Sequence, residues 1–164
     1  MMRRRFLPVV LTVSVIASLA LLAVLAIWVY RPDREVDASA SQSAIAVASE
    51  GTVAILSYAP DTVARDLDNA KSKLTGDFLK YYDEFTGQFV EPSAVQKGVR
   101  NTATVVRAAV SELHPDGAKV LVFINQSTTT KEKPQPVVTA SSVLVTVSKV
   151  DEKWLISSFD PNPA

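Results

Sequence analysis

The chain has 164 residues, which is enough for one domain and a terminal appendage. It contains no cysteine, so disulfides, thiolate nucleophiles and Cys-based metal sites are excluded. The part that follows Arg5 keeps 14 of the 17 basic residues and all 17 acidic ones, and its net charge of −3 excludes the basic face that nucleic-acid binding requires.

A long uncharged segment lies near the amino terminus. Residues 6–30 carry no charge, and a helix from Leu7 to Tyr30 would measure about 36 Å, against a hydrocarbon core of about 30 Å. A secretory signal has an apolar region of only about 7 to 15 residues, and here the small-residue cleavage site at 38–40 lies beyond the charged stretch 31–35. We therefore expect an uncleaved transmembrane anchor over 6–30 that contacts the bilayer, with cleavage as the disfavoured alternative.

The charges on either side of this segment predict its orientation. Three arginines, Arg3 to Arg5, precede it, whereas Arg31 and Arg34 alternate with acidic residues after it. Because the more basic flank stays in the cytoplasm, we expect a single-pass protein of the inner (cytoplasmic) membrane whose carboxyl-terminal part lies outside. The expected organisation is a basic cytoplasmic tail at 1–5, the anchor at 6–30, a linker at 31–40, an exported domain at 41–161 and a short tail at 162–164.

The exported domain begins with a region of expected helices. The first lies within 36–58, where Gly51 weakens the helical pattern by about 1 kcal/mol relative to alanine. A second helix is expected to be capped by Asp61 and to end before Gly76, which suits the left-handed conformation just past a helix end. Its apolar side consists of Val63, Leu67, Ala70 and Leu74.

A third helix carries an aromatic stripe. Its members are Phe78, Tyr81, Tyr82, Phe85 and Phe89, which recur at helical spacing. Such a stripe is more often core than pocket, and the core interpretation is favoured. The alternative is a ligand pocket lined by Phe78, Tyr81, Tyr82 and Phe85.

The remainder of the domain is rich in valine and threonine and predicts four antiparallel strands. Residues 99–112 and 118–129 flank a turn at His114–Gly117, and residues 137–150 and 153–159 flank a tight turn at Asp151 and Glu152. The fold class is therefore α+β, with a transmembrane helix followed by about three helices packed on a curved four-stranded sheet.

The second of these strands changes character at Asn125. Before it, Val120, Val122 and Ile124 alternate with Leu121 and Phe123, so we expect the strand to be covered on both faces and to lie in the centre of the sheet. From Asn125 both faces are polar, so we expect the strand to leave the core there. The exposed rim that this predicts is a candidate partner-binding surface and consists of Asn125, Gln126, Ser127, Thr128, Thr129 and Thr130.

The sequence offers no catalytic pattern. The single histidine, His114, lies in a turn, and the acid pairs Asp66/Asp68 and Asp83/Glu84 do not share a helix face. There is no zinc-ligand spacing and no Gly-rich phosphate loop. We therefore expect no enzyme, no cofactor and no metal.

Five ordered patches carry a resemblance to a known family. They are "LSY" at 56–58, "LTGDF" at 74–78, "TATVV" at 102–106, "VLVFINQSTTT" at 120–130 and "KVDEKWLISSFDP" at 149–161. In this order, after an apolar anchor, they resemble the Mce-associated membrane proteins of mycobacteria and related actinobacteria. The resemblance implies an NTF2-like, cystatin-like exported domain and an accessory role in Mce lipid import, with Mce and permease subunits and related accessory proteins as partners.

Two hypotheses follow for the exported domain. In the first it is a non-enzymatic module that docks on Mce-type subunits and supports their assembly or stability. In the second it encloses a pocket that holds a lipid or small molecule, or acts as an enzyme. Since no acidic residue or histidine falls on an apolar face, the first is favoured.

Overall fold

The computed structural model describes residues 18, 21–22, 24 and 38–161 of the chain. The chain divides into two compact units, Met1–Asp37 and Ala38–Ala164, and the fold below is that of the second. Several predicted segments lie outside the described residues. They are the cytoplasmic tail at 1–5, the anchor at 6–30 apart from four positions, the linker up to residue 37, and the tail at 162–164. In the part of the chain that is described, no helix is long and apolar enough to cross a membrane.

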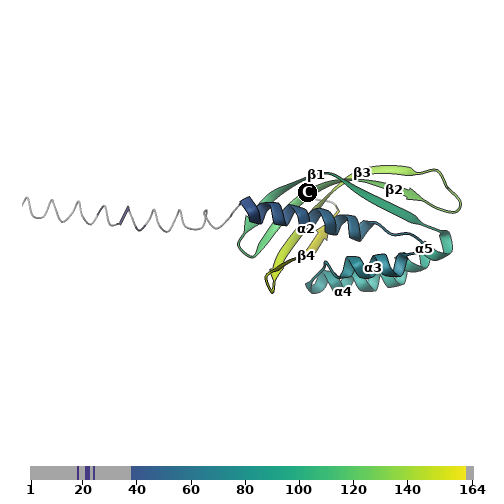
Figure 1. Ribbon diagram of the computed structural model, residues 1–164, viewed down its shortest axis with the longest axis horizontal. Coiled ribbons are helices and arrows are strands. Elements are labelled where there is room, and N and C mark those ends of the chain that lie inside the picture. Colours follow the sequence, from purple (N-terminus) through teal and green to yellow (C-terminus); the bar gives the residue numbers. More distant parts are fainter. Residues whose placement is uncertain (1–17, 19–20, 23, 25–37, 162–164) are drawn as a thin grey trace, which may run out of the picture. The chain divides into compact units, whose positions relative to one another are not determined.

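The second unit consists of a helical segment followed by one antiparallel sheet (Figure 1). The helices are α2 (Ala38–Leu56), α3 (Val63–Lys71), α4 (Gly76–Phe85), the π-helix η1 (Thr86–Val90) and α5 (Glu91–Lys97). The strands are β1 (Arg100–His114), β2 (Gly117–Thr129), β3 (Val137–Val150) and β4 (Lys153–Asp160), which lie side by side in chain order. The predicted α+β class, the four strands and both tight turns are confirmed.

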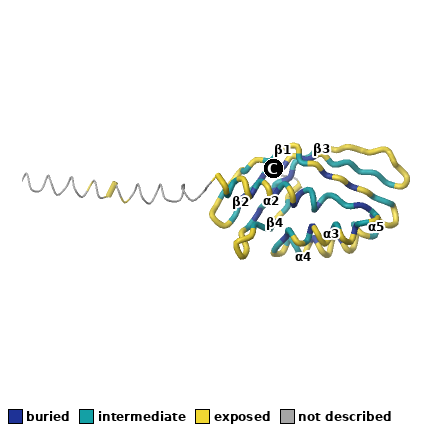
Figure 2. The backbone as a smooth tube through the Cα atoms, in the orientation of Figure 1, coloured by how far each residue is buried: buried dark blue, intermediate teal, exposed yellow. Residues whose placement is uncertain are grey.

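The core lies on one face of the sheet, the face that the helices cover. Val120 pairs with Val145 and Val122 with Val143, and all four side chains are buried. On the opposite face, Phe123 is exposed. The predicted central position of β2 is confirmed, but the expected cover on both faces is wrong, because the helices cover only one face. The alternation of valines along β2 and β3 therefore separates a helix-covered face from an open one, as Figure 2 shows by burial.

Helix α2 packs against this face through small residues. Ala44, Ala48 and Gly51 are buried, and a Cβ atom at Gly51 would lie 2.2 Å from Cδ1 of Ile156 on β4. The glycine that weakens the helical pattern is thus the residue that lets α2 approach the sheet closely.

The second helix ends earlier than predicted. Leu74 forms a parallel bridge with Ile156, and the backbone N–H of Thr75 donates to the carbonyl of Ile156 at 2.9 Å. These bonds tie 74–75 to β4 after a turn at 72–73, so α3 stops at Lys71, and Gly76 (φ 64°) lies at the start of α4. Its left-handed conformation is confirmed and its predicted place just past a helix end is wrong.

The helix that follows Pro60 begins one residue later than predicted. Thr62 occupies the N-cap position of α3, and its side chain makes no capping hydrogen bond there. Asp61 instead forms an ion pair with Arg100 on β1 at 3.1 Å. The predicted N-cap is therefore wrong, because the Asp61 carboxylate binds the Arg100 guanidinium group instead of the end of the helix.

Strand β2 does not leave the sheet at Asn125. It continues to Thr129, and Gln126 pairs with Ala103 on β1 and with Thr139 on β3. Of the six predicted rim residues, only Asn125 is exposed, and the other five are half-buried. The expectation of an exposed rim is therefore wrong for most of this stretch, because its polar side chains remain within a long central strand.

Candidate functional site

The carboxyl-terminal end of α2 is held by side chains from distant parts of the chain. The last four carbonyl groups of a helix have no partner within it. Here the Asn101 amide donates to the carbonyl of Leu56 at 2.6 Å, and the Tyr82 hydroxyl donates to the carbonyl of Ile55 at 3.2 Å. Strand β1 and helix α4 therefore both fix the end of α2.

The Asn101 side chain is the centre of a small, partly buried network. Its amide nitrogen also donates to Oε1 of Gln126 at 3.2 Å, and its Oδ1 accepts a 2.8 Å hydrogen bond from the Thr128 hydroxyl. We call Asn101, Gln126 and Thr128 the α2 cap network. Two members of the predicted polar rim thus serve an internal structural role.

A groove opens next to this network, between α2, α3 and the start of β1. It has a volume of about 700 Å³. Val53, Ala54 and Val105 provide apolar lining, and Tyr58 and Asn101 contribute polar groups. We call this cavity the α2–α3 groove.

The charged groups of the α2–α3 groove already have partners. Glu50 lies 3.9 Å from Lys73, and Arg100 is held by Asp61. The Asp66 carboxylate accepts hydrogen bonds from the Thr62 hydroxyl and from the backbone N–H of Ala59. The groove therefore presents no unpaired charge among these groups that would select a charged ligand.

Tyr58 is the titratable group whose environment in the groove is most altered. Burial raises the pKa of its phenol above the usual value of 10.0. The hydroxyl therefore stays protonated near neutral pH, where it can donate a hydrogen bond but is a poor nucleophile. The lining contains no histidine, so it offers no hydroxyl–histidine pair, and its Thr62 hydroxyl donates to the Asp66 carboxylate.

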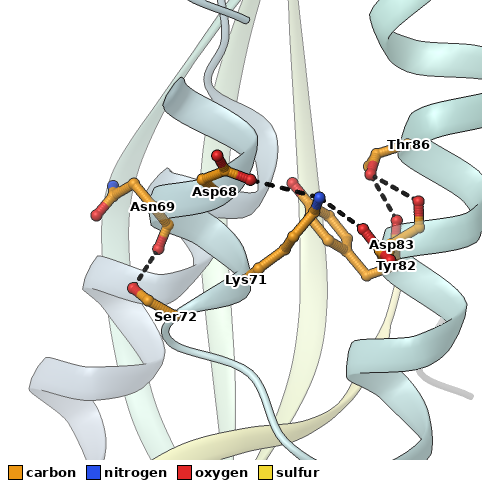
Figure 3. A network of polar contacts seen from close by, with 7 residues as sticks. All are labelled: Asp68, Asn69, Lys71, Ser72, Tyr82, Asp83 and Thr86. Carbon is orange, nitrogen blue, oxygen red and sulfur yellow. Dashed lines mark hydrogen bonds and ion pairs between the residues drawn. The ribbon is translucent and has the colours of Figure 1, made fainter. Parts of the chain in front are cut away.

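A second polar cluster joins α3 to α4 (Figure 3). The Lys71 ammonium group lies between the carboxylates of Asp83 and Asp68, with a distance of 3.5 Å to the latter. The hydrogen bond that the Lys71 ammonium group donates to the Asp83 carboxylate is the main cause that raises the pKa of Lys71. These three side chains lie on the outer surface of the two helices, so they do not form an enclosed site. The ion pair between Lys71 and Asp83 positions α4 against α3.

The four residues of the predicted pocket are in ring contact with one another but differ in burial. Tyr82 is buried and Phe78 is partly buried against the core, whereas Tyr81 and Phe85 are exposed. None of the four lines the α2–α3 groove. The core interpretation of the stripe therefore holds for its inner members and fails for Tyr81, Phe85 and Phe89.

The single histidine lies outside the α2–α3 groove. His114 is exposed at the end of β1, 4.0 Å from Glu112. Within the described residues, no group of three or more acidic or histidine side chains is placed to hold a metal ion. Asn101, which sequence reasoning did not single out, could have been found as an asparagine inside a valine- and threonine-rich strand, where that residue is disfavoured.

The sequence is similar to mycobacterial proteins. It is 54% identical over 154 residues to the uncharacterized protein Rv1362c of Mycobacterium tuberculosis, a match that covers 94% of this chain and 70% of the relative. It is 46% identical over 124 residues to the outer membrane protein Rv1973 of the same organism, covering 76% of this chain and 77% of the relative. No protein-family model matches the sequence.

Solved structures identify the fold. A periplasmic fragment of TraM aligns with a TM-score of 0.61 at 10% identity, over 75% of this chain and 97% of the fragment. VirB8 of Agrobacterium tumefaciens aligns with a TM-score of 0.58 at 14% identity, over 78% of this chain and 97% of VirB8. At such identities only the fold is shared, and the described unit has the NTF2-like fold of these domains.

Proposed function

Since the chain belongs to the same protein family as Rv1362c and Rv1973 of Mycobacterium tuberculosis, we propose that it is a membrane-anchored, non-enzymatic accessory protein of an Mce-type lipid import system. In this role it associates with Mce and permease subunits and supports their assembly or stability. The anchor is residues 6–30, with the amino terminus in the cytoplasm and the NTF2-like domain outside.

One observation carries the non-enzymatic part of the proposal. In the α2–α3 groove the Tyr58 phenol is protonated, the charged groups are paired with one another, and the lining contains no histidine. A surface of this kind binds and orients a partner without transforming it. The Mce part rests on the five ordered sequence patches and their resemblance to the Mce-associated proteins.

The location in the cell envelope is supported by the relatives and by the fold. One family member is named an outer membrane protein, and the TraM fragment of the same fold is periplasmic. An envelope location suits an accessory protein of a lipid importer. The choice of the cytoplasmic membrane comes from the uncharged segment 6–30 and its flanking arginines.

The experiment is affinity purification of the tagged full-length protein from its own membranes in mild detergent, with mass spectrometry of bound proteins and lipids. We expect enrichment of Mce and permease subunits, and loss of that enrichment when residues 31–164 are deleted. A protein that elutes alone with a stoichiometric lipid would contradict the accessory function.

A second candidate function is lipid or small-molecule binding, and the volume of the α2–α3 groove favours it. At about 700 Å³, the groove lies within the range of ligand sites, about 300 to 1,000 Å³. Val53→Trp would fill the groove from α2. Under the accessory function this variant keeps its partner subunits, whereas under the ligand-binding function it loses its lipid.

A further inference from the structure

One side of strand β3 has no neighbouring strand over the first half of its length. Strand β4 pairs with β3 only from Leu144, which lies opposite Asp160, to Val150. Strand β2 pairs with β3 as far as Val137, and Figure 1 shows β2 and β3 continuing together beyond the end of β4. Among the described residues, none makes a backbone hydrogen bond to the free side of residues 137–143. We call this segment the open β3 edge.

The open β3 edge presents both apolar side chains and backbone groups to solvent. Residues 137–140 are all exposed (Figure 2), and the exposed fractions of Val137 and Val138 are 56% and 66%. Successive residues of a strand direct their N–H and C=O groups to opposite sides, so about half of these groups in the segment face the free side. A row of unpaired backbone groups is a template for a further strand.

The outer strands of the same sheet are protected against such pairing, whereas the open β3 edge is not. Strand β1 has two register shifts, the first between Val105 and Arg107, and the short strand β4 is bridged by Leu74. Bulges, charged side chains and covering segments are the features by which proteins prevent edge-to-edge pairing. Residues 134–148 contain no charged residue, and the register between β2 and β3 is unbroken. The open β3 edge is therefore suited to pairing.

Two prolines mark the ends of the open β3 edge. Pro136 directly precedes Val137, the first residue of β3, and Pro161 directly follows Asp160, the last residue of β4. Since proline has no backbone N–H, neither residue can donate a hydrogen bond that would extend its strand. A strand that pairs with this edge must therefore fit between Pro136 and the end of β4.

A second copy of the chain supplies a strand of this length. Antiparallel pairing of two open β3 edges about a two-fold axis would put Ala140 opposite Ala140 and Val137 opposite Val143. Because β3 begins at Val137 in each copy, the pairing would stop where the β4 strand of the other copy begins. Opposite residues share a face, so the helix-covered faces of both copies would lie on the same side of one continuous sheet.

The composition of the open β3 edge suits pairing with itself. Residues near a two-fold axis meet their own copies, so a charged residue there would be repelled by its equivalent. Residues 137–143 contain no charge, and the residue at their centre is the small Ala140. A strand of another protein would need the same length and the same uncharged character, which the second copy has by identity.

We propose that two copies of the chain pair through their open β3 edges, antiparallel and centred on Ala140. The strand of each copy covers the exposed Val137 and Val138 of the other and satisfies the backbone groups of the free side. This inference goes beyond the accessory function proposed above and does not depend on it.

The test is disulfide cross-linking, which is specific because the chain has no cysteine of its own. Full-length Ala140→Cys is oxidised with copper phenanthroline in its own membranes and analysed by non-reducing electrophoresis. Opposite residues of antiparallel strands have Cα atoms about 4.5 to 5.5 Å apart, a separation that a disulfide spans. We expect a covalent dimer with a yield about tenfold above that of Ala109→Cys, a matched exposed alanine on β1.

A second pair of cysteines tests the register. Val138→Cys should not link to itself, because its equivalent would lie four positions away along the paired strand, about 13 Å. Val138→Cys co-expressed with Ser142→Cys should link, since these two residues would lie opposite one another. Self-linkage of Val138→Cys as strong as that of Ala140→Cys would overturn the proposal, and so would the absence of a dimer with Ala140→Cys.

A charge at the centre of the pair should separate the copies without cysteine chemistry. Ala140→Lys places like charges opposite one another, so the dissociation constant of the full-length dimer in mild detergent should rise at least about tenfold in sedimentation equilibrium. Ala109→Lys is the control and should leave the dimer intact. Both positions are exposed, so both variants should keep the circular dichroism spectrum of the wild type.

Other occupants and other contacts give different results. A wild-type protein that sediments as a monomer, or whose open β3 edge is found paired with a different protein, would overturn the proposal. A dimer that survives Ala140→Lys unchanged would also overturn it, because the contact would then lie elsewhere, for example in residues 6–30.

Discussion

The side-chain amide nitrogen of Asn101, near the start of β1, lies 2.6 Å from the carbonyl oxygen of Leu56, the last residue of α2. It satisfies a carbonyl that the helix itself leaves without a donor. Since α2 ends without a glycine in the left-handed conformation, this bond takes the place of a local cap. The helix end and the edge of the sheet are thereby fixed to one another.

Replacement of this amide should destabilise the domain. Asn101→Ala leaves the Leu56 carbonyl, the Gln126 amide oxygen and the Thr128 hydroxyl without their shared partner. Leu56, Gln126 and Thr128 are only half-buried, so we expect the free energy of unfolding to fall by about 1 to 3 kcal/mol, the cost of leaving one buried polar group unpaired. Urea unfolding of residues 38–164, followed by Trp154 fluorescence, measures the change.

The control lies on the neighbouring strand. Asn125→Ala removes an exposed asparagine that is outside the α2 cap network. It should change the free energy of unfolding by no more than about 0.5 kcal/mol. Equal effects of the two substitutions would show that the network contributes nothing specific.

Tyr82 should make stability depend on pH in the alkaline range. Burial, with a smaller contribution from Tyr58, raises the pKa of the Tyr82 phenol above its usual value of 10.0. As pH rises above about 10, the unfolded chain loses this proton first, so stability is full below that pH and is lost above it. Tyr82→Phe should cost about 1 kcal/mol at pH 7 through its hydrogen bond and should flatten the decline between pH 10 and 11.

The measurement is the urea midpoint of both proteins from pH 7 to 11. Lys71, whose pKa is also raised by its hydrogen bond to Asp83, contributes a decline of the same sign in both proteins. Tyr81→Phe, at an exposed position, serves as the control and should follow the wild-type curve. Parallel curves for wild type and Tyr82→Phe would contradict the assignment to Tyr82.

The sheet was predictable because its signals are local. The period-two alternation of valines along β2 and β3 indicates their strand conformation. The turn residues Pro115 and Gly117 fix the first hairpin, and the structure pairs His114 with Gly117 across it. Each of these features depends on residues that are close in sequence.

The fate of the polar residues was not predictable in the same way. Gln126 and Thr128 look like solvent-facing residues until Asn101, about 25 positions away, is placed opposite them. The exposure of Tyr81 and Phe85 is a similar case. The helical spacing of aromatic residues does not determine how many of them are buried in the folded domain. Here only Phe78 and Tyr82 pack against the core.

Gly51 tests the close approach of α2 to the sheet. Gly51→Ala should gain about 1 kcal/mol in helix propensity, but the added methyl group would lie 2.2 Å from Cδ1 of the fully buried Ile156. Overpacking of this kind costs about 1 to 3 kcal/mol, so we expect a net loss of stability. In the matched control, Gly87→Ala, no atom lies within 4 Å of the new Cβ, and stability should stay equal or rise. A more stable Gly51→Ala protein would mean that Ile156 moves aside freely.

A substitution in the hairpin turn between β3 and β4 should stabilise the domain. Asp151 and Glu152 both have positive φ angles, 47° and 63°, which glycine adopts without the steric cost that a Cβ atom imposes. Glu152→Gly creates the Asp-Gly pair that two-residue hairpins of this shape prefer. It also removes the 2.9 Å ion pair with Lys149, but Glu152 is so exposed that this pair contributes at most about 0.5 kcal/mol.

Because relief of the left-handed conformation outweighs this loss, the free energy of unfolding should rise by about 0.5 kcal/mol or more in Glu152→Gly. Lys149→Ala removes the same ion pair without changing the turn, so it isolates the electrostatic part. If Glu152→Gly lowers stability by as much as Lys149→Ala does, the turn stores no strain at Glu152. A rise in Glu152→Gly beside a small fall in Lys149→Ala would assign the gain to the backbone.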